Sequence, residues 1–124
     1  MDIIDKYKIQ YESVMYGPVS SNKVKSILHK YNVQNPLYSQ WLTRTGGGPI
    51  GPEWFDGVHE LEESQKKFNT EAWSIKGFVV GWDGAGNPMV LQPNGEIITE
   101  DHNFGGVHLV ASSFDTLLAQ NVSS

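Results

Sequence analysis

The chain has 124 residues, of which 39% are hydrophobic and 19% charged, proportions typical of one folded domain. It contains no cysteine, which excludes disulfide bonds, thiolate metal sites and a cysteine nucleophile. Six basic and three acidic residues occur up to Arg44, whereas three basic and eleven acidic residues follow it. Because an acidic body repels phosphate backbones, we expect no nucleic-acid partner; the charge serves either solubility or attraction of a basic protein.

No apolar run approaches the roughly 20 residues that a membrane helix needs, so we expect no membrane partner. The acidic start Met1-Asp2-Ile3-Ile4-Asp5 lacks the basic and apolar regions of a secretory signal. The expected location is therefore the cytoplasm.

Three helices are predicted in the first part of the chain. The first ends before Gly17-Pro18, and its apolar face contains Ile3, Ile4, Tyr7, Tyr11 and Val14, although residues 7–11 also fit a strand. The second begins at the capping residues 20–22 and buries Val24, Ile27, Leu28 and Tyr31. The third begins at Asn35-Pro36, ends at residues 45–48, and buries Leu37, Tyr38, Trp41 and Leu42.

The second part predicts a helix over residues 61–68, a meander of strands and a closing helix. The strands are expected at residues 77–82, 88–91, after Asn94-Gly95 and at 107–110, while Trp54-Phe55 is strand or turn. A two-residue loop at Asn94-Gly95 would place Leu91 opposite Ile98. Ser112 or Ser113 is expected to cap the last helix.

Few residues form a pattern typical of nucleotide binding, metal binding or catalysis. Residues 46–51 match the letters of a dinucleotide-binding loop, but they follow a helix and include Pro49, so we expect a helix stop and tight turn. The four histidines show no metal-ligand spacing, and neither a metal nor another cofactor is expected. His59 or His102 with a carboxylate could serve a small hydrolase, although surface histidines are favoured, and no catalytic residue is predicted.

Several short motifs occur in a fixed order between residues 35 and 118. They are the helix and turn Asn35-Pro36-Leu37-Tyr38-Ser39-Gln40-Trp41-Leu42 with Gly46-Gly47-Gly48, the segments Gly86-Asn87-Pro88-Met89-Val90-Leu91, Asn94-Gly95-Glu96-Ile97 and Asp101-His102, and the helix Ala111-Ser112-Ser113-Phe114-Asp115-Thr116-Leu117-Leu118. This order resembles the SUKH superfamily, which includes fungal cell-wall-synthesis and killer-toxin-resistance regulators and many bacterial immunity proteins. The chain departs from the family at Gln92, where Asp is frequent, and at Asn35-Pro36, which displaces the usual Leu-Pro.

The resemblance implies a single α+β domain over residues 1–124, with helices packed on a curved, mainly antiparallel sheet. It also implies a non-enzymatic module that binds and neutralises a cognate bacterial toxin, and the acidic body agrees with a basic, nuclease-type toxin. A regulatory or scaffolding domain of the same fold, with another partner, is the alternative. We expect a monomer or weak homodimer.

Exposed acids and aromatic residues near the turns are the expected contacts with that partner. They are Trp54, Asp56, Glu60, Trp82, Asp83, Glu100, Asp101 and Phe104.

Overall fold

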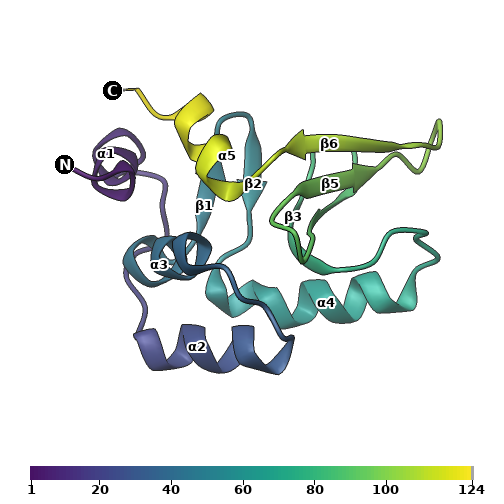
Figure 1. The fold of residues 1–124 in the computed structure, drawn as a ribbon, viewed down its shortest axis with the longest axis horizontal. Coiled ribbons are helices and arrows are strands. Elements are labelled where there is room, and N and C mark those ends of the chain that lie inside the picture. Colours follow the sequence, from purple (N-terminus) through teal and green to yellow (C-terminus); the bar gives the residue numbers. More distant parts are fainter. Residues whose placement is uncertain (124) are drawn as a thin grey trace.

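Six strands form one antiparallel meander in the computed structural model, which describes residues 1–123 (Figure 1). The strands are β1 (Gly48–Ile50), β2 (Glu53–Phe55), β3 (Phe78–Trp82), β4 (Pro88–Leu91), β5 (Ile97–Glu100) and β6 (Val107–Ala111). Their order in the sheet is their order in the chain, and the sheet curls into a half-barrel. The predicted α+β class and antiparallel sheet are confirmed.

Five α-helices surround this sheet within the described residues. They are α1 (Ile3–Gln10), α2 (Ser21–Lys30), α3 (Pro36–Thr45), α4 (Leu61–Thr70) and α5 (Phe114–Asn121), with a 3-10 turn η1 (Val58–Glu60) before α4. Ser20, Asn35 and Ser113 cap α2, α3 and α5 by accepting backbone amide hydrogens, as their sequence positions predict. No helix in residues 1–123 has the length and apolarity needed to cross a membrane.

The first helix is shorter than the sequence predicts. It ends at Gln10, and the Val14 and Met15 amides both bond to the Tyr11 carbonyl in a turn that follows it. Val14, which was expected on the buried face, is consequently 44% exposed. The turn is required because the next segment must run along residues 45–48, where Tyr16 bonds to Gly47.

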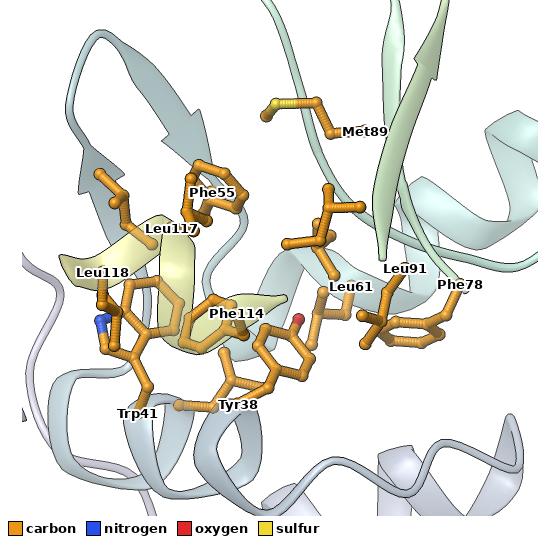
Figure 2. Packing of buried hydrophobic residues seen from close by; sticks show 14 of the residues in the cluster. Tyr38, Trp41, Phe55, Leu61, Phe78, Met89, Leu91, Phe114, Leu117 and Leu118 are labelled. Carbon is orange, nitrogen blue, oxygen red and sulfur yellow. The ribbon is translucent and has the colours of Figure 1, made fainter. Parts of the chain in front are cut away.

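Aromatic side chains join the helices to one face of the sheet (Figure 2). Tyr38 and Trp41 of α3 are fully buried, and their ring centroids lie 5.2 Å and 5.4 Å from that of Phe114 on α5. Trp41 also contacts Phe55 of β2, and Tyr38 contacts Phe78 of β3. The buried stripe predicted for the third helix is therefore the centre of the main core.

Helix α4 covers the opposite face of the sheet. Its Phe68 packs with Val79 and Val90 in a second, smaller cluster. The buried side chain of Gln65 accepts the Val79 amide and donates to the Val79 carbonyl, both at 2.8 Å. Gln65 thus takes the place of a strand neighbour where β2 has ended, and it fixes α4 against β3.

The hairpin between β4 and β5 differs from the sequence prediction by one residue. Leu91 faces Ile97, and Val90 faces Ile98. The loop has three residues, because Gln92 and Glu96 still share a hydrogen bond and Gly95, with φ of 95°, adopts the left-handed conformation that such loops need. The observed register places Leu91 and Ile97 together in the main core, and the predicted pairing of Leu91 with Ile98 is wrong.

Strand β1 was not expected, since residues 46–51 predicted only a helix stop and a turn. The stop is confirmed: Gly46 ends α3 in the left-handed conformation. The chain then continues as a short strand that pairs with β2. Trp54-Phe55, left open between strand and turn, is a strand.

Replacement of Trp41 by alanine should destabilise the whole domain, because this side chain contacts α1, α3, α5 and β2. We expect a loss of about 3–5 kcal/mol in the free energy of unfolding, measured by urea denaturation. The control is Ile9→Ala on the 65% exposed Ile9, which should change stability by less than about 0.5 kcal/mol. A similar small effect for both variants would contradict this role of Trp41.

Candidate functional site

The glycine turn after α3 brings three backbone segments together. Tyr16 N donates to Gly47 O at 3.0 Å, and Val58 N donates to Gly46 O at 3.1 Å. A Cβ atom on Gly47 would lie 2.5 Å from the Asp56 carbonyl oxygen, and the φ of 108° disfavours any other residue. Only glycine therefore permits residues 15–17 and 56–58 to lie on either side of this turn.

This arrangement creates an exposed aromatic patch, which we define as Tyr16, Trp54 and His59 with Glu60. The Tyr16 ring lies edge-to-face with Trp54 and with His59, at centroid distances of 5.8 Å and 4.8 Å. The Tyr16 hydroxyl donates to Glu60 Oε1 at 3.1 Å, and the same oxygen accepts the Gly57 amide at 2.8 Å. Tyr16 and Trp54 remain 46% and 43% exposed. The rings are held in place before any partner arrives, which lowers the entropy cost of binding.

Trp82 supports the patch from the neighbouring strand. It lies opposite Trp54 in the pairing of β2 with β3. Its indole nitrogen donates to Ser64 Oγ at 3.0 Å, and Lys67 Nζ lies 4.1 Å from its ring centroid. Trp82, which was expected among the exposed contacts, is therefore half-buried beneath a lysine.

Asp56 lies behind the patch and is only 7% exposed, so the expectation that it is an exposed contact residue is wrong. Its carboxylate accepts a short hydrogen bond from the Ser64 hydroxyl. Burial raises the pKa of Asp56 from 3.8 to about 6, and the Glu60 charge adds to the increase, while Ser64 and Lys67 oppose it. Sequence alone could not place Asp56 inside, because the fixation of α4 by Gln65 is what covers it.

The other four predicted contact residues lie in the turns that follow β3 and β5, at the end of the sheet where Trp82 ends β3. Asp83 accepts the Ala85 and Asn87 amides, both at 2.9 Å. Asp101 accepts the Asn103 and Phe104 amides, which hold its pKa below the usual range. Glu100 accepts the Ser74 hydroxyl at 2.6 Å and the amides of Ser74 and Ile75, and its pKa is lowered by these bonds. Phe104 is 92% exposed.

Every acid of the predicted set is thus engaged within the chain. Asp56, Glu60, Asp83, Glu100 and Asp101 all accept hydrogen bonds from neighbouring loops or side chains. These acids hold turns in shape as well as carrying negative charge, so reversing their charge would disturb the loops. The eight residues fall into two groups, one around the aromatic patch and one at the turns near His102.

Three residues of these groups were missed or assigned differently from the sequence. Tyr16 follows a helix that was predicted to extend further, so its proximity to Trp54 had no local signal. His59 was considered only for hydrolysis, yet its ring lies against Tyr16. Asn87, which is 5% exposed, joins two turns: its Nδ2 donates to Asp83, and its Oδ1 accepts the His102 amide at 3.0 Å.

The histidines have no carboxylate partner among residues 1–123. His102 Nδ1 lies within hydrogen-bond distance of the Asn87 side-chain oxygen, and because that oxygen can only accept, Nδ1 is the donor in this bond. Within the same residues, no group of three or more histidine, aspartate or glutamate side chains is arranged to hold a metal ion. The arrangement offers an aromatic contact surface more directly than an acid–base pair.

Comparison of the sequence with protein-family models finds no match, and a search of curated proteins finds no significant match. The resemblance described above depends on the order of the motifs. Two of those motifs, Gly86-Asn87-Pro88 and Asp101-His102, meet in space through the bonds between Asn87 and His102.

Replacing Asp56 by asparagine should stabilise the protein in a pH-dependent manner. The folded-state pKa of about 6 exceeds the ordinary 3.8, so the folded state binds the proton more tightly, and the wild-type protein loses stability as pH rises from about 4 to above 6. Asparagine still accepts the Ser64 bond but cannot ionise. The variant should therefore match the wild type near pH 3.5 and exceed it at pH 7, by up to about 3 kcal/mol.

Urea denaturation at both pH values measures this difference. The exposed Glu12→Gln variant serves as the control and should show no such trend. If the difference in unfolding free energy between Asp56→Asn and the wild type does not change with pH, burial does not raise the pKa of Asp56.

Proposed function

We propose that the chain is a bacterial immunity protein of the SUKH type, which binds and neutralises a cognate toxin in the cytoplasm. Support comes from the ordered motifs between residues 35 and 118 and from an α+β arrangement of the kind that the resemblance implies. The acidic half of the chain supports a basic toxin of the nuclease type.

The observation that carries the proposal is the aromatic patch. Exposed tyrosine and tryptophan are enriched at binding hot spots, where they supply large contact area at low entropy cost. Here Tyr16 and Trp54 stand on a backbone fixed by the glycine turn and by Glu60.

Inhibition in this proposal is steric and electrostatic. The patch occupies the toxin's active or substrate-binding surface, and the negative charge of the chain raises the rate of association with a basic toxin. No reaction is catalysed and no cofactor takes part. A regulatory or scaffolding domain of the same fold is the alternative, and a hydrolase that uses His59 or His102 is less favoured because Asn87 rather than a carboxylate bonds His102.

Co-expression tests the proposal directly. The candidate toxin is the product of the open reading frame adjacent to the gene for this chain, produced with and without the chain in the same host. Protection of the host and co-purification of the two proteins are expected. If the chain neither protects nor binds, the immunity function is wrong; binding without protection would favour the regulatory alternative.

Truncation of Trp54 should weaken the toxin complex and leave the fold intact. Trp54 is 43% exposed, so Trp54→Ala removes contact surface without opening the core. We expect the dissociation constant to rise at least about tenfold, through faster dissociation, when measured by surface plasmon resonance. Ile9→Ala, at the 65% exposed Ile9 of α1, serves as a control and should bind as the wild type does. If Phe104→Ala weakens the complex and Trp54→Ala does not, the contact surface is the turns near His102 instead.

Charge reversal at acids that do not hold a turn through hydrogen bonds should slow association with the toxin. Glu53 precedes Trp54 in β2, and Glu63 is exposed on α4, with only a 3.6 Å ion pair to Lys66. The double variant Glu53→Lys with Glu63→Lys should lower the association rate about tenfold at low salt and much less at high salt, with little change in dissociation. A rate that is unchanged at low salt would contradict electrostatic steering.

A further inference from the structure

The two edge strands of the sheet, β1 and β6, differ in whether their outer backbone groups have hydrogen-bond partners. The β1 edge is short, contains Pro49, and its Pro49 carbonyl accepts the Tyr7 hydroxyl at 2.6 Å. The flanking Gly47 carbonyl and Gly51 amide also have partners, in Tyr16 N and Tyr11 OH. The outer backbone of β6 has none of these: beyond its ladder with β5, no described residue bonds to the backbone of Val107–Ala111. In Figure 1, β6 lies above β5, in the part of the sheet farther from α4.

An apolar row of side chains runs across the sheet and ends uncovered on β6. Val79, Val90, Ile98 and Leu109 are successive partners from β3 to β6. Val79 and Val90 are fully buried beneath α4, Ile98 is half-buried, and Leu109 is 58% exposed. Val107, two residues from Leu109 on the same face, is 51% exposed. The cover that α4 gives to one end of the row is missing at the other.

The sequence of β6 contains none of the residues that usually protect an edge strand. Val107–Ala111 has no lysine, arginine, acid or proline. The one protective feature is the irregularity at Val110, where the register with β5 shifts and a bulge is formed. The straight part of the edge is therefore Val107, His108 and Leu109.

We propose that a second copy of this chain pairs with β6, antiparallel and about a two-fold axis, with His108 facing His108 of the second copy. In this register Val107 of one copy faces Leu109 of the other, twice. The uncovered ends of the two apolar rows then cover each other, and the backbone edge gains hydrogen-bond partners.

A second copy fits this edge better than the proposed basic toxin does. β6 carries no acid that would attract a basic protein, and the nearest acids, Glu100 and Asp101, are engaged in bonds within their own chain. Pairing of two β6 strands brings no acidic side chains of the strands together, whereas contact between the acidic parts of two chains would cause like-charge repulsion. The contact is small, so the dimer is expected to be weak and concentration-dependent. The inference does not depend on the proposed immunity function.

Sedimentation equilibrium from about 10 µM to about 1 mM at pH 8, where ordinary histidines are neutral, tests the association. The wild-type chain should shift from monomer toward dimer over this range. Leu109→Lys, which places two lysines in the contact, should weaken dimerisation at least about tenfold. Ile9→Lys adds the same charge at a residue of similar exposure on α1 and should dimerise as the wild type does.

The absence of cysteine allows the register to be tested by cross-linking. Facing residues in an antiparallel pair have Cα atoms about 4.5–5.5 Å apart, a spacing that a disulfide spans. His108→Cys should therefore form a covalent dimer on mild oxidation. Val107→Cys and Leu109→Cys should each cross-link poorly alone and efficiently when mixed, because they face each other and not themselves.

A wild-type chain that stays monomeric up to about 1 mM would overturn the proposal, as would a dimer that Leu109→Lys leaves unchanged. A dimer lost in Leu109→Lys but without the mixed cross-link would overturn the register. If the chain is monomeric and Leu109→Lys abolishes toxin binding, β6 serves the toxin and not a second copy. Failure of the toxin experiments alone would leave the dimer result standing.

Discussion

The packing of Tyr38 and Trp41 against Phe114, Phe55 and Phe78 is the constraint on which the other features depend (Figure 2). Burial of large aromatic surface is the main stabilising contribution in a domain of this size. Because both rings belong to α3, this contact also fixes where α3 ends. The glycine turn that follows is held at one position against the sheet, and the segments on either side of it are held with it.

The candidate surface is a consequence of that position. Tyr16 arrives from the N-terminal segment, Trp54 from β2, and His59 with Glu60 from the turn before α4. Tyr16 is far in the sequence from the other two segments, which are close to each other in the chain. The acids around them stabilise the turns, because each accepts hydrogen bonds from neighbouring groups. Their negative charge would act on a partner through the long-range electrostatic potential and not through direct contacts of free side chains. In the proposed function, the aromatic rings contact the partner and the negative charge attracts it.

The curled sheet has two covered faces and two unequal edges. Residues of α3 and α5 close one face, and α4 closes the other through Phe68 and Gln65. A helix of ten residues cannot cover six strands, so the apolar row that begins under α4 reaches β6 without cover. The aromatic patch and the β6 edge involve different strands, which permits a partner protein and a second copy to be bound independently.

The helices after residue 20, with caps at residues 20–22, at Asn35 and at residues 112–113, could be predicted from the sequence. The same holds for most strands of the meander and for the buried stripe of the third helix, because these features depend on periodicity and on bonds between near neighbours. The sequence also placed Trp54 at the surface, where it is 43% exposed. Four other features follow from tertiary packing: the hairpin register, the burial of Asp56, the contact of Tyr16 with Trp54, and the bonds through which Asn87 joins Asp83 to His102. Each of these depends on contacts between distant segments, whose positions are set by core packing and close glycine contacts that leave no periodic signal in the chain.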